Sequence, residues 1–370
     1  MSRELRAVII DDSRSYQLLL QKVLEEIGDI KVVGKASNGN TGLRMIELYQ
    51  PDFITLDVEM PIMDGLETLK KLKATKPDVS VIMVSALTKQ GAQVTMRALE
   101  AGAFDFIAKP AMETREASHK ALIEQLSPKV ESLKKKKRFF KKKDSPRSLP
   151  CLTKHASSMF GREKKADCIK KQARNKKEPV SIIGLGISTG GPNALKKVIP
   201  QLPGSLQAPI LIVQHMPPIF TQVLADSLNQ QSELTVKEAV DGDIVSKGFV
   251  YIAPGGKQMK VIRQDALLKI HITDDPPEKN CKPSVDYLFR SLASQCRGGA
   301  MGVIMTGMGR DGTLGLKLMK RHGSLVIAQN EETCTVFGMP MEAIKSGLVD
   351  MILPLEKIAD GIQNTLRGKY

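Results

Sequence analysis

Hydrophobic positions in the first 127 residues alternate between short apolar runs and amphipathic stretches. The runs predict strands at residues 6–10, 32–36, 53–56, 81–84 and 106–108, and the stretches between them have helical spacing. The same alternation returns after residue 179, with apolar runs at 180–185, 210–214 and 300–305. This pattern is typical of the α/β class, so we predict two doubly wound, mostly parallel-sheet domains.

A strongly basic segment separates these two regions of the chain. Residues 128–178 hold 19 Lys and Arg residues against five Asp and Glu residues, which is nearly all of the net charge of +15. A segment with so much like charge and few periodic apolar positions repels itself and cannot offset its chain entropy by burial. We therefore predict a basic flexible linker at 128–178 between a domain at 1–127 and a domain at 179–370.

The remaining composition narrows the class of protein. No apolar run approaches the roughly 18–20 residues of a membrane span, and the start of the chain lacks a signal-peptide pattern, so we expect a cytoplasmic protein. The five cysteines are odd in number and include no C-x-x-C pair. This spacing favours reduced structural thiols over a disulfide framework or a zinc site.

Polar side chains follow several of the predicted strands in the first region. They are Asp11 and Asp12, then Asp57, then Ser85, then Lys109. Because the carboxyl ends of parallel strands converge on one crevice, we expect these side chains to meet there. Close carboxylates repel unless a cation such as Mg²⁺ lies among them, and Asp57 would then act as the nucleophile in a phosphoryl transfer.

With these residues, region 1–127 resembles a two-component response-regulator receiver domain, which is flavodoxin-like. The motifs are Ile10-Asp11-Asp12-Ser13, Leu56-Asp57-Val58-Glu59-Met60-Pro61, Val84-Ser85-Ala86 and Lys109-Pro110. The resemblance implies that a histidine kinase phosphorylates Asp57 and that Ser85 and Lys109 sense the phosphoryl group. It also implies Mg²⁺ bound by Asp12, Asp57 and the carbonyl of Glu59, with help from Asp11. Phe106 stands where many receivers have Tyr, so switching by a phenolic hydroxyl is not expected.

In the second region, Ser188 lies in the G-x-S-x-G stretch Gly186–Gly190, between an apolar run and a helix that Pro192 should begin. Such a turn exposes the serine oxygen and aims backbone N–H groups at a developing oxyanion. Glycine-rich strand–helix turns also bind phosphate or serve packing. A dinucleotide fingerprint is disfavoured, because Thr189 occupies a position that would need glycine.

A base for Ser188 should come from another strand end, and His215 ends the apolar run 210–214. The other histidines, His119, His155, His271 and His322, are less well placed. Four acids are candidates for orienting the imidazole: Asp241, Asp243, Asp286 and Asp311. Asp311 is favoured because it lies in a glycine-rich turn after the run 300–305. The predicted order Ser188, His215, Asp311 differs from that of α/β-hydrolases.

Region 179–370 resembles the catalytic domain of chemotaxis protein-glutamate methylesterases, which is Rossmann-like. The motifs are Gly186–Pro192, Gln214–Pro217, Tyr251–Gly255, Pro283–Asp286 and Thr306–Gly312. The resemblance implies the triad above, with Thr189 and Met308 near the oxyanion and no cofactor for ester hydrolysis. The implied substrates are γ-glutamyl methyl esters on membrane chemoreceptors, with deamidation of receptor glutamines as a second activity.

Two other functions and one further partner remain open from the sequence. A DNA-binding transcriptional response regulator would use the basic segment, although no helix-turn-helix pattern follows residue 179, so no specific nucleic acid is expected. The second alternative is a hydrolase with the same active site that acts on another ester or amide outside chemotaxis. The lysines at 134–137 and 141–143 around Phe139-Phe140 also predict weak contact with anionic membranes.

Overall fold

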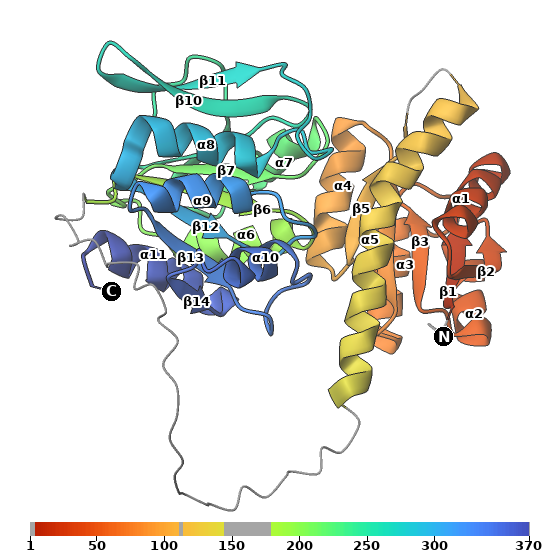
Figure 1. Cartoon of the computed structure of the whole chain (residues 1–370). Coiled ribbons are helices and arrows are strands. Elements are labelled where there is room, and N and C mark those ends of the chain that lie inside the picture. Colours follow the sequence, from red (N-terminus) through yellow and green to blue (C-terminus); the bar gives the residue numbers. More distant parts are fainter. Residues whose placement is uncertain (1–3, 111–113, 144–178, 370) are drawn as a thin grey trace, which may run out of the picture.

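The computed structural model describes residues 4–110, 114–143 and 179–369. The first domain is a parallel sheet with helices on both faces (Figure 1). Its elements are β1 (Leu5–Ile10), α1 (Arg14–Ile27), β2 (Ile30–Ala36), α2 (Gly39–Tyr49), β3 (Phe53–Asp57), α3 (Gly65–Thr75), β4 (Ser80–Ser85), α4 (Lys89–Glu100), β5 (Asp105–Ala108) and α5 (Arg115–Lys143). All five predicted strands are present, within two residues of the expected bounds.

The strand order of this sheet is β2-β1-β3-β4-β5, and every pairing is parallel. The chain moves outward from β1 in both directions, so the ends of β1 and β3 form a topological switch point. β3 and β4 are buried along their whole length, because helices cover both faces. The order therefore places the end of β1, with Asp11, beside the end of β3, with Asp57.

Helix α5 corrects the expectation of an extended segment from residue 128. It runs through Pro128 to Lys143, and Val130 and Leu133 on it are buried. Together with Leu122 and Leu126 they continue an apolar face at helical spacing into the lysine-rich region. Burial of that face outweighs the local charge repulsion, so residues 128–143 are helical. Residues 144–178 lie outside the described residues.

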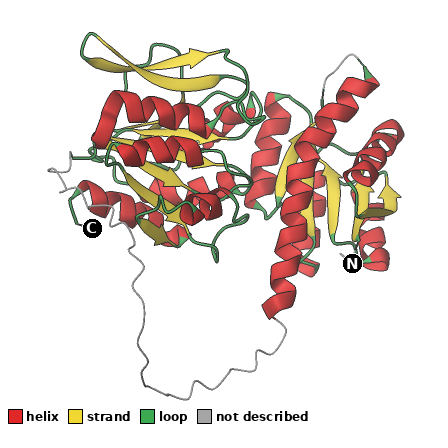
Figure 2. Cartoon of the chain, in the orientation of Figure 1, coloured by secondary structure: helices red, strands yellow, loops and turns green. Residues whose placement is uncertain are grey.

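The second domain contains a seven-stranded parallel sheet, also covered on both faces, and a separate hairpin (Figure 2). Its elements are β6 (Ile182–Ile187), α6 (Gly191–Val198), η1 (Ile199–Gln201), β7 (Ile210–Gln214), α7 (Phe220–Asn229), β8 (Thr235–Glu238), β9 (Phe249–Ile252), β10 (Gln258–Gln264), β11 (Leu267–Thr273), α8 (Val285–Cys296), η2 (Arg297–Gly299), β12 (Ala300–Ile304), α9 (Thr313–Arg321), β13 (Leu325–Gln329), α10 (Met339–Lys345), β14 (Met351–Leu353), η3 (Leu355–Lys357) and α11 (Ile358–Leu366). The antiparallel pair β10–β11 forms the hairpin.

The strand order of the second sheet is β14-β13-β12-β6-β7-β9-β8, so β6 and β12 flank its switch point. Two glycines on β6 allow helix α8 to lie close against this strand. A Cβ at Gly184 would lie 2.5 Å from Leu292 Cδ1, and one at Gly186 would lie 2.4 Å from Val285 Cγ1. The close approach brings the N-terminus of α8 to the carboxyl ends of β6 and β12.

The two domains meet through α4 and α5 of the first and through α6, α7 and nearby loops of the second (Figure 1). Asn193 Nδ2 donates to Leu99 O at 2.7 Å, and Lys196 pairs with Glu100. The rings of Phe106 and Phe220 stack with centroids 4.5 Å apart. Because buried apolar residues from both domains belong to one cluster, the receiver-like domain is packed against its neighbour rather than merely tethered to it.

We predict that Gly184→Ala destabilises the second domain, since the added methyl group forces Leu292 and Phe289 away from β6. Overpacking of this kind typically costs about 1–3 kcal/mol. Thermal unfolding followed by circular dichroism measures the loss. Gly204→Ala is the matched control, because its nearest contact is 3.3 Å away. Equal melting temperatures for the two variants would contradict the prediction.

Candidate functional site

The turn that carries Ser188 follows β6 directly. The Ser188 N–H donates to Thr306 O at 2.9 Å, and the Gly191 N–H donates to Ser188 O at 2.8 Å. Gly190 has φ 77°, a left-handed conformation that glycine adopts without strain. A Cβ at Gly307 would lie 2.7 Å from Ser188 Cβ. The glycines therefore allow the loop after β12 to pass close to the serine.

His215 follows β7, the strand that pairs with β6. Its backbone N–H donates to Ile187 O at 3.2 Å. The neighbouring Gln214, which is buried, donates through Nε2 to Ser188 O at 3.0 Å and to His215 O at 3.2 Å. The motif Gln214–Pro217 includes this residue, but the sequence analysis assigned it no role. A polar side chain at the end of a buried strand is the feature that could have indicated a structural role. Gln214 links the serine turn to the histidine.

Asp311 lies against the ring of His215, with Oδ2 2.8 Å from Nε2. Its carboxylate also accepts hydrogen bonds from Ser284 Oγ at 3.0 Å, Val285 N at 2.7 Å and Asp286 N at 3.0 Å. These donors form the N-terminus of α8, where the helix dipole favours a negative charge. Of the four candidate acids, the structure brings Asp311 to His215.

The pKa values of this pair are shifted in opposite directions. Burial alone raises the pKa of Asp311, but the hydrogen bonds from His215 and the α8 amides prevail and lower it to about 2. Burial likewise lowers the pKa of His215, but the hydrogen bonds to Asp311 and Cys281 prevail and raise it to about 10. At neutral pH the resting pair is therefore an imidazolium beside a carboxylate.

The other three candidate acids are engaged elsewhere. Asp241 Oδ1 lies 2.8 Å from His271 Nδ1 on the surface, and Asp243 Oδ1 lies 2.8 Å from Lys237 Nζ. Asp286 pairs with Lys279 and accepts a hydrogen bond from Gly315 N at 2.8 Å. Among the other histidines, His119 contacts Glu26 and His322 ends helix α9, as its Lys-Arg-His-Gly context predicts, while His155 lies outside the described residues.

The described residues give no hydrogen bond between the Ser188 hydroxyl and His215, which is common in sites without substrate. Since Nε2 faces Asp311, Nδ1 is the nitrogen that remains for a proton from Ser188. Thr189 is buried, and its carbonyl accepts a hydrogen bond from Thr306 Oγ1 at 2.9 Å. Met308 follows in the next loop, with Sδ 3.3 Å from Ser132 Oγ of α5.

The loops on either side of Ser188 are connected to the first domain. The Val336 N–H donates to Thr306 Oγ1 at 3.0 Å, the same hydroxyl that bonds Thr189. Val336 and Met308 both belong to the apolar cluster that includes Leu126 and Val130 of α5. Helix α5 therefore contacts the two segments that border the candidate nucleophile.

The predicted acidic pocket forms at the carboxyl edge of the first sheet. Lys109 Nζ lies 2.6 Å from Asp57 Oδ2 and 3.2 Å from Asp11 Oδ2. Carboxylate oxygens of Asp11, Asp12 and Asp57 lie within 4.8 Å of one another. Burial raises the pKa of Asp57 to about 6 even though Lys109 opposes the shift. The structure thus brings these four side chains together.

The acidic pocket fits a hard divalent cation. Asp11 Oδ2 is buried and, apart from its ion pair with Lys109, accepts no hydrogen bond among the described residues, which suits an oxygen ligand. An adjacent hollow of about 460 Å³ is lined by Asp12, Glu59, Asp64 and neighbouring apolar residues. The Glu59 side chain is exposed, and its backbone N–H bonds the Asp57 carboxylate.

Ser85 and Phe106, the remaining predicted residues of this domain, lie in different places. Ser85 is buried at the end of β4, where its hydroxyl donates to Ala86 O at 3.3 Å. Phe106, in contrast, points to the domain contact and stacks on Phe220. Sequence reasoning missed Tyr16 of α1, whose ring centroid lies 4.8 Å from Lys109 Nζ. This cation–π contact stabilises the charged lysine.

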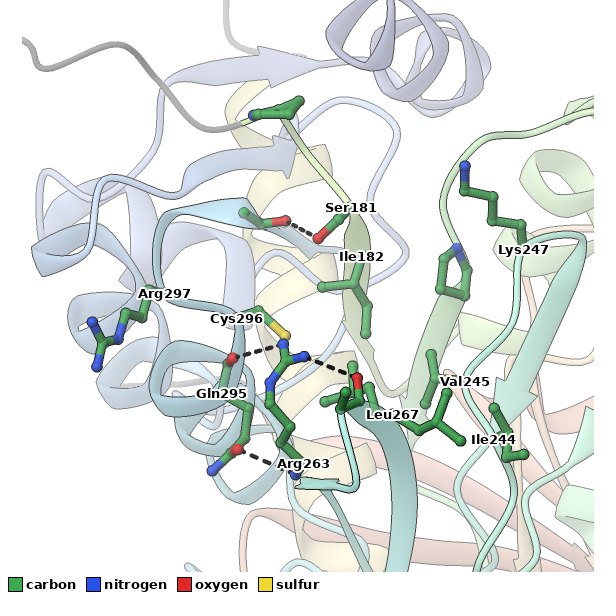
Figure 3. A pocket seen from close by; sticks show the side chains of 15 residues that line it. Ser181, Ile182, Ile244, Val245, Lys247, Arg263, Leu267, Gln295, Cys296 and Arg297 are labelled. Carbon is green, nitrogen blue, oxygen red and sulfur yellow. Dashed lines mark hydrogen bonds between the residues drawn. The ribbon is translucent and has the colours of Figure 1, made fainter.

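A hollow of about 580 Å³ lies away from these residues (Figure 3). It is lined by Ser181, Ile182 and Gly299 at the amino ends of β6 and β12, whereas Ser188 lies at the carboxyl end. Arg263 crosses it and donates to the carbonyls of Ala266 and Gln295, both at 3.4 Å. This hollow is therefore separate from the candidate active site.

Comparisons with known proteins agree with the geometry. Residues 183–362 match the family model of CheB methylesterase, and residues 7–120 match that of the response regulator receiver domain. A protein-glutamate methylesterase/protein-glutamine glutaminase of Desulfotalea psychrophila is 45% identical, over 99% of this chain and 99% of its own. The chain belongs to this methylesterase family.

Another relative with the same name, from Bacillus licheniformis, is 43% identical over 98% of this chain and 99% of its own. The crystal structure of the Thermotoga maritima CheB methylesterase catalytic domain is 44% identical and covers 50% of this chain and 97% of its own, with a TM-score of 0.49. The methylesterase family model leaves the DNA-binding alternative without support. No helix within the described residues is long and apolar enough to span a bilayer.

We predict that the His215 ring titrates far above the usual histidine range, with a pKa of about 10. NMR titration of the ring should show that Asp311→Asn lowers this pKa, while Asp241→Asn leaves it unchanged. Because the folded pKa is above the unfolded value, the contribution of His215 to stability is fully present below about pH 6.5 and is lost as pH rises through the folded pKa. An unshifted His215 in the unaltered protein would contradict the prediction.

Proposed function

We propose that Ser188, His215 and Asp311 form a serine esterase site that hydrolyses glutamate γ-methyl esters on chemoreceptors. The observation that carries this proposal is the 2.8 Å bond between His215 Nε2 and Asp311 Oδ2, which orients the imidazole beside the Ser188 turn. The names of the relatives give methyl esters of protein glutamate as their substrate and the deamidation of protein glutamine as a second activity. That the protein is a chemoreceptor is our proposal from the sequence resemblance. Both reactions are acyl transfers to the same serine oxygen.

In the proposed mechanism, the resting imidazolium of His215 first releases its Nδ1 proton to solvent. Ser188 Oγ then attacks the side-chain carbonyl while the neutral His215 accepts the serine proton at Nδ1. Asp311 holds Nε2–H and stabilises the imidazolium that forms. The tetrahedral intermediate then breaks the C–O bond, and Nδ1–H protonates the departing methoxide, which leaves as methanol. Water, deprotonated by His215, hydrolyses the acyl-enzyme to glutamate and free Ser188. With glutamine as substrate, ammonia leaves instead of methanol.

Backbone amides in the loops that flank Ser188 are proposed to bind the oxyanion, with Thr189 on one side and Met308 on the other. Each good donor of this kind contributes about 3 kcal/mol to transition-state stabilisation. Met308 also contacts Ser132 of α5. The position of the receiver helix therefore affects the oxyanion loop as well as access to it.

The receiver domain is proposed to control this site through Asp57. A receiver domain has a histidine kinase as its general partner, and Asp57 would accept the phosphoryl group. Asp11, Asp12 and Asp57 would hold Mg²⁺, which neutralises phosphoryl oxygens when it is bound. Lys109 now pairs with Asp57 and would move to a phosphoryl oxygen, and the hydroxyl of Ser85 lies on the neighbouring strand end.

The contact between the domains supports inhibition of the resting enzyme. Phe106 lies on β5, next to β4 and its terminal Ser85, and it stacks on Phe220 of the catalytic domain. A change at Ser85 and Lys109 on phosphorylation would reach Phe106 through this strand pair. We propose that the change loosens the contact of α4 and α5 with the catalytic domain and exposes Ser188 to the receptor.

One described lysine of the basic segment is not available for the predicted membrane contact. Lys134 Nζ lies 3.0 Å from Glu131 Oε1, 3.6 Å from Asp29 Oδ2 and 3.1 Å from Gly28 O. Lys134 is therefore engaged within the receiver domain. The side chains of the remaining lysine cluster lie outside the described residues, and their contact with anionic lipid stays a prediction.

We predict that Ser188→Ala reduces methanol release from a methylated receptor by at least about 10⁴-fold, because the nucleophile is lost. The full chain is measured with and without a small-molecule phosphodonor. Asp57→Asn should keep the unstimulated rate and lose the stimulation. A Ser188→Ala enzyme with normal rates would refute the assigned nucleophile. Stimulation that survives Asp57→Asn would refute the assigned phosphorylation site.

We also predict that Asn193→Ala combined with Lys196→Ala raises methanol release without a phosphodonor. The double variant removes the hydrogen bond to Leu99 and the ion pair with Glu100, so the receiver is held less tightly. Lys197→Ala is the matched control, since Lys197 is exposed on the same helix. If the double variant were no faster than Lys197→Ala, these contacts would not restrain the enzyme.

A further inference from the structure

The candidate active site contains a thiol that the proposed mechanism does not use. Cys281 Sγ lies 3.8 Å from Nδ1 of His215, the nitrogen turned away from Asp311. The Cys281 side chain is half-buried, so solvent reaches it. Its Sγ, a nitrogen of His215 and an oxygen of Asp311 lie within 4.8 Å of one another. Sulfur, nitrogen and oxygen atoms that can bind metals thus lie close together around the His215 ring.

Hydrogen bonds and an ion pair hold the loop that carries Cys281 in place. Its backbone pairs with Glu278 through hydrogen bonds of 2.8 and 3.1 Å. The Cys281 carbonyl accepts from Gln258 Nε2 at 3.3 Å, and the Glu278 carboxylate pairs with Arg290 of α8. Since α8 also holds Asp311, one helix positions both the thiol loop and the carboxylate. The three groups are held in place without a ligand.

Their geometry matches a borderline-soft metal ion. Zn–S and Zn–N bonds of about 2.3 and 2.0–2.1 Å at a tetrahedral angle imply a sulfur–nitrogen separation of roughly 3.6 Å. The Cys281–His215 separation of 3.8 Å is close to this value. Asp311 accepts the other ring N–H, the arrangement that orients many metal-binding histidines. A thiolate and an imidazole favour Zn²⁺ over Mg²⁺ or Ca²⁺.

We propose that His215 Nδ1 and Cys281 Sγ, oriented through Asp311, bind a borderline-soft divalent cation such as Zn²⁺, and that the bound ion inhibits the esterase. Binding forms one metal–nitrogen and one metal–sulfur bond and releases the protons of Nδ1 and the thiol to solvent, with no change of oxidation state. The metal then occupies the lone pair that must receive the Ser188 proton. The inhibitory half of this inference rests on the proposed function, whereas the binding half does not.

The other described thiols provide matched controls. Burial raises the pKa of Cys296 to about 11 and that of Cys334 to about 12, so both stay protonated. The sequence expectation of structural thiols suits these two residues. The sequence pattern did not single out Cys281, because the residues near Cys281 come from the ends of other elements and not from a C-x-x-C pair.

The binding test uses the full chain with saturating Mg²⁺, which fills the acidic receiver pocket. Zn²⁺ is titrated in competition with a chromophoric chelator. We expect Cys281→Ala to weaken Zn²⁺ binding at least about tenfold and Cys296→Ala to leave it unchanged. Cys281→His, which restores a metal ligand, should recover affinity. Equal affinity of Cys281→Ala and the unaltered protein overturns the proposed site.

Co²⁺ provides a second readout that depends neither on activity nor on the stability of Cys281→Ala. A thiolate-to-cobalt absorption band should appear in the unaltered protein and in Cys296→Ala and be absent from Cys281→His. A band that persists without Cys281 overturns the assignment. Inhibition is then measured as methanol release relative to each variant's own metal-free rate. Cys281-dependent Zn²⁺ binding with an unchanged rate would overturn the inhibitory half alone.

Discussion

The hydrogen bond between His215 and Asp311 is the interaction on which the arrangement of the candidate active site depends. It joins the end of β7 to the loop after β12, and the N-terminus of α8 supplies the amides that hold the carboxylate in place. Helix α8 reaches this position because glycines on β6 leave room for it. A packing feature in the middle of the sheet therefore determines the charge and orientation of an imidazole at its edge. Without the carboxylate, burial would lower the pKa of His215 and favour the neutral ring.

The receiver domain adds a second constraint at the same edge. Its helices α4 and α5 lie against the catalytic domain, and α5 contacts Met308 and Val336 on the two loops that border Ser188. Thr306 connects these loops, since its hydroxyl bonds both the Thr189 carbonyl and the Val336 amide. A shift of the Val336 segment would therefore change the contacts of the serine turn through Thr306. The surface that packs against the first domain and the shape of the candidate site are thus linked by one side chain.

The sequence predicted both sheets and the strand-end residues well, because long buried strands and parallel topology leave few arrangements for the residues that follow them. This reasoning predicted that Asp311 lies beside His215 and that Asp11, Asp57 and Lys109 meet, and the structure has both arrangements. What the sequence did not reveal depends on contacts between distant elements. The hydrogen bonds that α8 gives Asp311, the bridging amide of Gln214 and the position of Cys281 are examples. Helix α5 was shortened in the prediction because its lysines obscured an apolar face that becomes buried only in the tertiary structure.

The length of α5 also bears on how such proteins can be divided or recombined. The receiver family model ends at residue 120, yet the buried positions of α5 extend to Leu133. A receiver excised at a boundary near residue 127 would lose part of the α5 surface that contacts Met308. Exchange of receivers between relatives would keep this contact only if the whole of α5 were exchanged with the domain. The structural unit therefore extends beyond the residues that the receiver family model covers.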